Sequence, residues 1–341
     1  MIAANTHGLP KKRDLVLLIA AFAAVYVIWG STYLAIKYAI ETMPTFLMAG
    51  TRFVVAGAIL YGIARLTPGY EKPKLVHWRT SLIIGTALLA IGNGGVVMAE
   101  HYISSSLAAL LVAVVPFWIV LIGWIFMGTG RPNGKVVLGL LVGFAGVWLL
   151  VSGQGSAAPG TQGESHQLLG AGLLMISTLG WAGGSLYGTR APMVRSAIQG
   201  SGMQMLTGGT VMLIIGTLTG EWSGLDIAAI SLNSWLGLLY LIFFGAIVGY
   251  TAYSWLLKNA SPTAVTTYAY VNPVVAVILG WSIAGETMTG QMLIGAAVIV
   301  GSVALITLHK KVKHVPEPVL DPTEFPRQNI KTGEFPQYST R

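Results

Sequence analysis

Nine stretches of this chain contain no Lys, Arg, Asp or Glu, and each is long enough to cross a lipid bilayer. They cover 15–36, 80–99, 101–130, 136–163, 165–189, 196–220, 227–257, 259–285 and 287–309, and a tenth apolar stretch, 42–64, is interrupted only by Arg52. A spanning helix needs about 20 mostly apolar residues. We therefore predict an all-α integral membrane protein with ten transmembrane helices, at approximately 14–36, 44–65, 81–100, 106–127, 135–152, 168–188, 198–219, 234–256, 263–283 and 288–309.

The distribution of charge between these runs predicts the orientation of the chain. Cations alternate with acids from loop to loop: Lys11–Arg13, Arg65, Lys72, Lys74, Arg79, Arg131, Lys135, Arg190, Arg195, Lys258 and Lys310–Lys313 on one side, and Glu41, Glu100, Glu164, Glu221, Asp226 and Glu286 on the other. Short loops rich in Lys and Arg stay in the cytoplasm. We expect a multi-pass protein of a bacterial inner membrane with both termini cytoplasmic.

Composition excludes several classes of function. The net charge is +8, but the cations lie between apolar runs rather than on a soluble face, so we expect no nucleic-acid partner. The chain has no cysteine, and its six histidines lie in the tails or at the ends of predicted spans. Because neither a metal constellation nor convergent catalytic groups can be recognised, we predict no enzyme, no metal site and no cofactor.

The middle of the chain divides the predicted helices into two groups of five. We predict a cytoplasmic N-terminus at 1–13, a first half at 14–152, an external linker at 153–167, a second half at 168–309 and a basic, then disordered, cytoplasmic tail at 310–341. Pro116, Gly123, Trp124 and Gly128 recur at a shift of 157 as Pro273, Gly280, Trp281 and Gly285. An odd number of spans per half inverts the second copy, and inverted repeats are typical of transporters that work by alternating access.

The residues also resemble a known family. Trp29 to Tyr33, followed by Lys37, Pro44, Arg52 and Phe53, is similar to the opening of EamA-type members of the drug/metabolite transporter superfamily. The segments Ser106–Leu111 to Gly128, and Val271–Pro273 to Glu286, resemble the fourth and ninth helices of that family. The resemblance covers about 14–309 and implies two inverted five-helix EamA repeats that export small metabolites, such as amino acids, through a cavity between helices 1, 3, 4, 6, 8 and 9. One departure is Arg131 after Gly128, Thr129 and Gly130, where the family commonly has Gly-Glu.

Polar and aromatic residues near the middle of the predicted spans form the candidate substrate site. They are Trp29, Tyr33, Asn93, Trp181, Tyr187, Tyr250, Tyr253, Tyr270 and Asn272, with Tyr268 beside them. Such groups are costly in a membrane unless they are paired, and as a set they suit a small zwitterionic or amphipathic solute. Interhelical hydrogen bonding and packing is the alternative for any single one of them.

Two prolines and four titratable residues complete the set of candidates. Pro116 and Pro273 each remove a backbone donor near the centre of a span, so we interpret them as paired kinks that line and gate the cavity. Arg52 is the one charge well inside a span; with Lys37 it either polarises the outer vestibule or reaches the headgroups. Glu100 and His101 form a titratable pair at the outer end of helix 3, and protons are a candidate coupling ion there.

The sequence thus predicts a secondary transporter that exports small metabolites, most readily amino acids. The alternatives are a multidrug exporter and a facilitative channel. The expected partners are a small-molecule substrate and membrane lipid, and the protein is expected to be a monomer or a dimer. The substrate, the transport direction and the coupling ion are not determined by these patterns.

Overall fold

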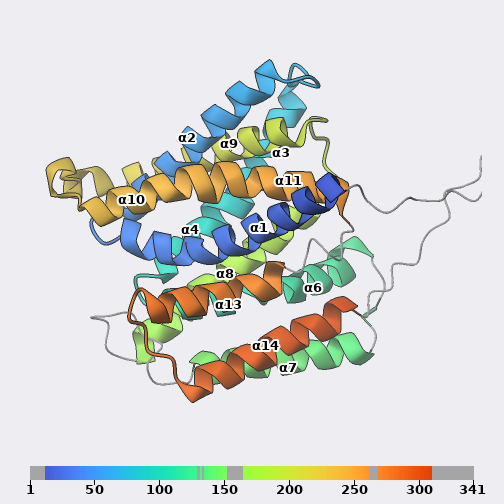
Figure 1. Ribbon diagram of the computed structural model, residues 1–341, viewed down its shortest axis with the longest axis vertical. Coiled ribbons are helices and arrows are strands. Elements are labelled where there is room, and N and C mark those ends of the chain that lie inside the picture. Colours follow the sequence, from blue (N-terminus) through green and yellow to red (C-terminus); the bar gives the residue numbers. More distant parts are fainter. Residues whose placement is uncertain (1–11, 129–130, 133, 152–163, 261–267, 309–341) are drawn as a thin grey trace, which may run out of the picture. The chain divides into compact units, whose positions relative to one another are not determined.

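The structure is a computed structural model that describes residues 12–128, 131–132, 134–151, 164–260 and 268–308, and within these ranges the chain forms helices and no β-strand (Figure 1). The helices are α1 (Lys12–Ala39), α2 (Thr45–Leu66), α3 (Leu75–Gly85), η1 (Thr86–Asn93), α4 (Gly94–Ala99), α5 (Ser105–Val112), α6 (Val115–Met127), α7 (Gly134–Val151), α8 (Glu164–Gly188), α9 (Ala197–Leu218), η2 (Glu221–Gly224), η3 (Ile227–Ala229), α10 (Leu232–Tyr240), η4 (Leu241–Val248), α11 (Gly249–Asn259), α13 (Tyr268–Ser282) and α14 (Gly290–Leu308). Most of the predicted N-terminal segment 1–13 and of the linker 153–167, and all of the tail 310–341, lie outside the described residues.

Seven helical segments in the described part of the chain are long and apolar enough to cross a membrane. They are Leu15–Ala39, Thr45–Leu66, Leu75–Ala99, Ser105–Met127, Ser165–Gly188, Ala197–Leu218 and Leu232–Tyr253, and shorter apolar helices occur at Gly134–Gly146, Val271–Ser282 and Gly290–Ser302. The all-helical membrane architecture is thereby confirmed, while three of the ten predicted spans remain predictions. The third helix begins at Leu75 rather than at the predicted residue 81. Its first turns carry polar and charged side chains, so the apolar run used for the prediction starts later than the helix itself.

Two of the spanning segments change helical type in their middle. The third is α-helical, then π-helical in η1, then α-helical again in α4. The segment Leu232–Tyr253 repeats this order in α10, η4 and the start of α11. A π-helical turn rotates the residues that follow it relative to a regular α-helix, and such turns are frequent at functional sites.

The two prolines predicted to kink their helices differ in their local structure. The fourth spanning segment breaks after Val112, and Pro116 lies in the first turn of the new helix α6. A proline is well tolerated there because the N–H groups of a first turn have no intrahelical acceptor. Pro273 instead lies inside the continuous helix α13. Pro116 thus lies at an interruption of its helix and Pro273 within a continuous one, and the role of the two prolines in gating stays a prediction.

Helices α2 and α9 cross at four glycines, two from each helix. A Cβ added at Gly50 would lie 2.9 Å from the carbonyl oxygen of Gly209, and one added at Gly57 would lie 2.9 Å from that of Gly202. The two backbones therefore touch, a packing that only small residues allow in membrane helices. Gly202 and Gly209 stand at the same shift of 152 from Gly50 and Gly57.

The loop after each member of this pair covers the start of the other. The carboxylate of Glu221, after α9, accepts hydrogen bonds from the backbone N–H groups of Phe46 and Leu47 in the first turn of α2, with the shortest at 2.8 Å. Glu71, after α2, accepts from the N–H of Arg195 at 2.9 Å, two residues before α9 begins. A carboxylate near the start of a helix accepts from backbone N–H groups that have no acceptor within the helix, and its negative charge interacts favourably with the helix dipole.

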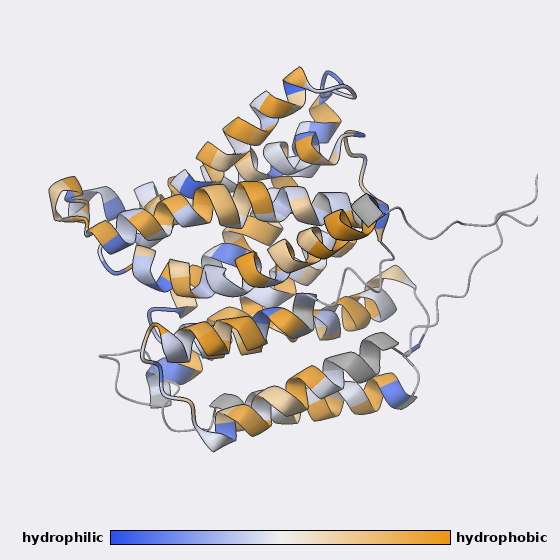
Figure 2. Cartoon of the chain, in the orientation of Figure 1, coloured by the Kyte–Doolittle hydropathy of each residue, from blue (hydrophilic) through white to orange (hydrophobic). Residues whose placement is uncertain are grey.

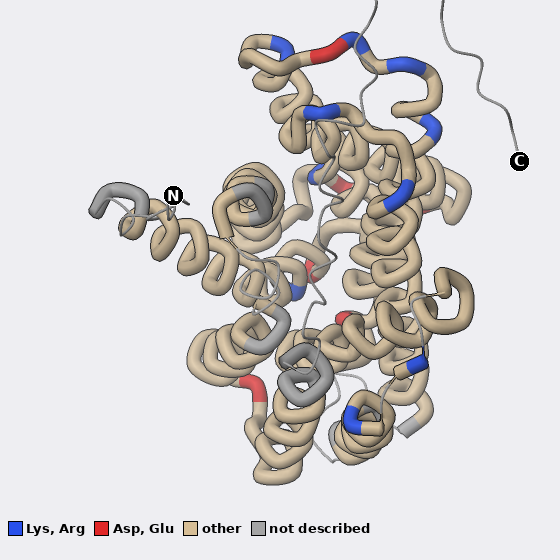
Figure 3. The backbone as a smooth tube through the Cα atoms, turned by 90° about the vertical axis from the view of Figure 1, so that its right-hand side faces the viewer, with Lys and Arg blue, Asp and Glu red and all other residues tan. Residues whose placement is uncertain are grey.

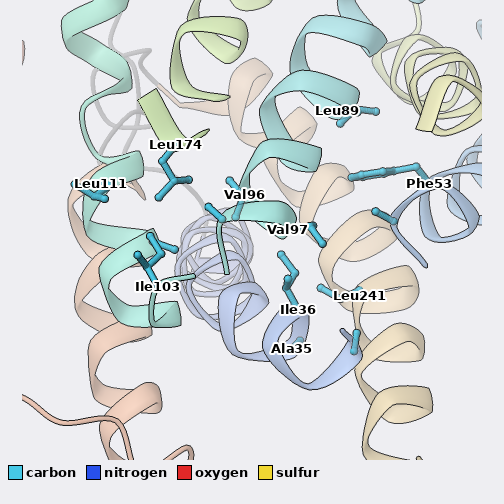
Figure 4. Close-up of a cluster of buried hydrophobic side chains, with 14 of the residues drawn as sticks. Ala35, Ile36, Phe53, Leu89, Val96, Val97, Ile103, Leu111, Leu174 and Leu241 are labelled. Carbon is cyan, nitrogen blue, oxygen red and sulfur yellow. The ribbon is translucent and has the colours of Figure 1, made fainter. Parts of the chain in front are cut away.

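Hydrophobic residues occur along all the helices (Figure 2), and large apolar side chains lie both in the interior and on the outer surface. Ile36, Phe53, Val97 and Leu241 meet in the buried cluster of Figure 4, which joins α1, α2, α4 and η4. Large apolar side chains also face outward, among them Phe126 at 78% exposure. A surface of this kind is stable against lipid, not against water.

Candidate functional site

Glu286, just beyond α13, is the centre of a network of hydrogen bonds at the start of α5. Its carboxylate accepts from the N–H and hydroxyl groups of Ser105, at 3.0 and 2.7 Å, and from those of Ser106, at 3.1 and 2.5 Å. The ammonium group of Lys37, in the last turn of α1, lies 3.1 Å from the same carboxylate. Burial opposes its ionisation, but the serine donors and Lys37 lower the pKa of Glu286 below its ordinary value. This side chain therefore ties α1, α5 and α13 together as a carboxylate.

Glu100 lies close to this network but takes no part in its hydrogen bonds. It follows α4 directly, is only 5% exposed, and neither carboxylate oxygen has a hydrogen-bond partner among the described residues. Burial, and then the charge of Glu286, raise the pKa of Glu100 well above its ordinary value, while Lys37 and Arg52 act in the opposite direction. The surroundings thus favour the charged carboxylate of Glu286 and the protonated form of Glu100.

Arg52 is buried in the middle of α2 and does not reach the headgroups. Its side chain is 3% exposed, and its guanidinium group donates to the Asn93 amide oxygen at 3.5 Å. The guanidinium carbon lies 4.3 Å from the centre of the Phe53 ring, and Nε has no hydrogen-bond partner in the described part of the chain. Asn93 is positioned by the end of η1. A buried guanidinium group with an unused donor is chemically complementary to a carboxylate.

Three tyrosine rings gather around Trp29 of α1. The ring centres of Tyr250, Tyr253 and Tyr268 lie 5.4, 5.1 and 5.3 Å from that of Trp29. The indole N–H of Trp29 donates to the carbonyl oxygen of Gly245 in η4 at 3.2 Å. The π-helical segment thus supplies the acceptor that orients the indole, and α11 and α13 supply the other rings.

The remaining predicted residues are distributed over several environments. Asn272 bonds through its amide nitrogen to the carbonyl oxygens of Tyr26 and Tyr268, so it links α1 to α13. His101 bonds to the hydroxyl group of Thr45 at 2.7 Å, beside the start of α2, and burial lowers its pKa.

Three more candidates make no ring contact with Trp29 among the described residues, and the side chain of a fourth is not described. Trp181 of α8 packs against η1, since a Cβ at Gly92 would lie 3.0 Å from its ring. Tyr187 is 39% exposed on the last turn of the same helix, and Tyr33 packs at the edge of the buried apolar cluster. The side chain of Tyr270 lies outside the described residues.

Sequence reasoning missed the serines that bind Glu286. The signal was available, because Ser104, Ser105 and Ser106 precede an apolar run, as residues at a helix start often do. Glu286 itself was recognised only as part of a family motif. Its hydrogen-bond partners lie 180 and 181 positions away, so no local pattern connects them.

Comparison with known proteins gives a consistent result over almost the whole chain. The EamA-like transporter family matches residues 15–152 and again residues 168–308. The uncharacterized inner membrane transporter YedA of Escherichia coli strain K12 is 38% identical over 301 residues, which cover 87% of this chain and 93% of that protein. A probable amino-acid metabolite efflux pump of the same strain is 25% identical over 286 residues, covering 81% and 89% of the two chains.

A solved structure supports the same fold. One crystal structure with 21% sequence identity superposes with a TM-score of 0.56 and covers 86% of this chain and 97% of its own. The family and these curated relatives are membrane transporters and not enzymes. With a match that extends over both halves and a relative at 38% identity, this chain belongs to the EamA-like transporter family.

Proposed function

We propose that this transporter exports small metabolites, amino acids foremost, across the inner membrane by alternating access. The observation that carries the proposal is that Arg52 and Glu100, a buried base and a buried acid, interact electrostatically without an ion pair between them and keep unused hydrogen-bonding atoms. Buried charges are costly unless they are paired. An amino acid supplies both missing partners, a carboxylate for Arg52 and an ammonium group for Glu100.

The aromatic cluster completes this arrangement. In the proposed complex the substrate side chain packs on Trp29, Tyr250 and Tyr253, while Asn93 holds the guanidinium group of Arg52 in place. Arg52 also interacts electrostatically with Tyr250, so the charged and aromatic groups form neighbouring parts of one site. A mostly aromatic wall with a few fixed polar groups is typical of small-molecule sites.

The α2–α9 contact supports an inverted-repeat mechanism. The pairs Gly50–Gly209 and Gly57–Gly202 exchange under a shift of 152, as expected for helices related by a two-fold axis in the membrane plane. The loops that carry Glu71 and Glu221 obey the same relation, since each lies against the start of the opposite helix. We propose that the two halves alternate around this pair, with Pro116 and Pro273 as the gating positions.

Glu100 would couple transport to protons. Its raised pKa means that the carboxylate is present only above that value, so substrate binding should strengthen as pH rises through it. Counterflow of labelled amino acids into preloaded proteoliposomes, measured over a pH series with and without a pH gradient, tests the function. Glu100→Gln should flatten the pH profile and abolish the response to the gradient, whereas Glu41→Gln, an exposed acid on the same predicted side, should change neither.

Three outcomes would contradict this proposal. If Glu100→Gln keeps the response to the pH gradient, Glu100 is not the coupling residue, because a glutamine side chain cannot take up and release the proton. Failure of folded protein to exchange any amino acid would remove that substrate class. Non-saturating flux would instead support a channel.

A multidrug exporter is the second candidate, favoured by the ring cluster around Trp29. Aromatic faces bind organic cations, and Glu100 is a carboxylate that could pair with them. The same counterflow assay with a labelled aromatic cation separates the two functions, because an amino-acid exporter should not exchange it.

The proposed orientation predicts which exposed positions are labelled from each side. The chain has no natural cysteine, so single cysteines report without background. Ser223→Cys, in η2, should react with an impermeant maleimide added to intact cells, and Thr67→Cys, after α2, should react only after permeabilisation. Both positions are exposed, whereas Ser104, at 7% exposure, would react poorly. The reverse labelling pattern would refute the cytoplasmic placement of the termini.

A further inference from the structure

Besides the buried site, the structure contains an open hollow at the junction of α2 and α3. Its volume is about 620 Å³, and it is lined by Tyr61, Arg65, Tyr70, Lys72, Pro73 and Trp78. Figure 3 shows Lys and Arg residues gathered at this end of the protein. By the distribution of cations, this is the side predicted to face the cytoplasm. Nothing in the proposed transport mechanism uses these residues.

The aromatic side chains hold the cation of Arg65 in a defined place. The guanidinium carbon of Arg65 lies 5.2 Å from the centre of the Tyr61 ring. Tyr61 in turn contacts Trp78, with ring centres 5.9 Å apart, and its hydroxyl group lies 3.3 Å from that of Tyr70. Arg65 also interacts with the hydroxyl groups of both tyrosines, and because a guanidinium group has five N–H donors, some of them remain for a ligand.

The cations of the hollow have no acidic partner in the described part of the chain. No carboxylate there lies within ion-pair distance of Arg65 or Lys72. The neighbouring acid, Glu71, is directed to the start of α9 instead, where it accepts from the N–H group of Arg195. The hollow therefore keeps two positive charges and unused donors, and it is complementary to an anion with several acceptor oxygens.

The surroundings of the hollow favour an anion that carries acyl chains. Leu66 and Leu75, at the end of α2 and the start of α3, are 88% and 85% exposed, so two large apolar side chains flank the cationic residues. Tyr and Trp at the ends of spanning helices lie at the level of lipid headgroups. Basic pockets at this depth on the cytoplasmic side bind anionic headgroups. We propose that this hollow binds the phosphate of an anionic phospholipid, with Arg65 and Lys72 on the phosphate and Leu66 and Leu75 against the chains.

Native mass spectrometry of the delipidated full-length protein tests the proposal. Phosphatidylglycerol should bind the wild type more tightly than phosphatidylcholine, which has no net charge. Each cation near the membrane surface contributes about fivefold in affinity, so Arg65→Gln with Lys72→Gln should weaken phosphatidylglycerol binding roughly 25-fold. The matched control is Arg131→Gln with Lys135→Gln, which removes the same charge from another loop of the same side and should leave the affinity within about twofold.

Further arms separate the possible sources of the phosphate and the possible loss of folding. Inorganic phosphate, added to lipid-free micelles, should not protect the protein against thermal unfolding, because it lacks the chains that contact Leu66 and Leu75. Protection by phosphate alone that matches the protection by phosphatidylglycerol would overturn the lipid assignment. An equal loss of affinity in both double variants would show non-specific attraction and also overturn it. Should the first double variant be aggregated, Tyr70→Phe, which removes one hydroxyl group from the lining, should weaken phosphatidylglycerol binding several-fold, and unchanged binding would contradict the site.

Discussion

Replacing Arg52 with Gln is expected to lower the counterflow efficiency, kcat/KM, for an amino acid by about 100-fold or more. The loss of one member of a buried, hydrogen-bonded charge pair costs about 2–5 kcal/mol, and tenfold corresponds to about 1.4 kcal/mol. Arg52 is 3% exposed with one nitrogen unpartnered, so water cannot replace it and a substrate carboxylate would be fully desolvated. Arg52→Lys should recover only part of the activity, because an ammonium group cannot make the paired contacts of a guanidinium group.

A substrate analogue separates recognition of the carboxylate from a purely structural role of Arg52. The wild type should discriminate strongly between an amino acid and the amine formed by its decarboxylation, whereas Arg52→Gln should treat both almost equally. Arg79→Gln, an exposed arginine on α3, is the control and should leave this discrimination intact. If Arg52→Gln lowers both rates but keeps the discrimination, the residue supports the fold and does not bind the carboxylate.

The second large effect is expected on stability, where Gly57→Leu should leave little folded protein. A Cβ at Gly57 would lie 2.7 Å from the backbone nitrogen of Leu206 and 2.9 Å from the carbonyl oxygen of Gly202, and neither backbone atom can move aside alone. Inserting a larger side chain in a packed interior costs about 1–3 kcal/mol, and more where the backbone must separate. The α2–α9 contact would open along its length, and the opposite pair Gly50–Gly209 would separate with it.

Gly62→Leu is the matched control because it lies on the same helix and has nothing within 4 Å of its added Cβ. The monodisperse fraction after detergent extraction and the thermal unfolding midpoint measure the effect. Gly57→Leu should lower both strongly, and Gly62→Leu should lower neither. Equal behaviour of the two variants would mean that the close contact between the helices does not contribute to stability.

Much of the architecture was accessible from the sequence because membrane helices satisfy their own backbone hydrogen bonds. The length of an apolar run therefore nearly determines the helix, and α2 lies at Thr45–Leu66 where 44–65 was predicted. The third helix was misplaced at its start because the polar side chains near Trp78 extend beyond the apolar run. The π-helical segments η1 and η4 were not foreseen, since neither contains a residue type that demands a wider turn.

Prediction of the site was limited by long-range partners. Trp29, Tyr250 and Tyr253 were grouped by depth in the membrane, and they do lie together. Tyr187 was grouped by the same criterion but lies exposed, because depth alone does not say which face of a helix a residue occupies. From the sequence, the side chain of Arg52 could either be buried in the protein or reach the lipid headgroups. Packing of the whole bundle decides between the two, since Arg52 is 3% exposed and donates to Asn93, which is 41 residues away at the end of η1.

The exchange of capping groups between the halves has a consequence for biogenesis. The ribosome completes α2 long before it reaches Glu221, so the N–H groups of Phe46 and Leu47 have no acceptor there until α9 and the loop after it have been made. Glu71 is made early, but the start of α9 that it covers does not yet exist. The nascent first half is therefore an incomplete folding unit, and its final docking occurs only after the second half has entered the membrane.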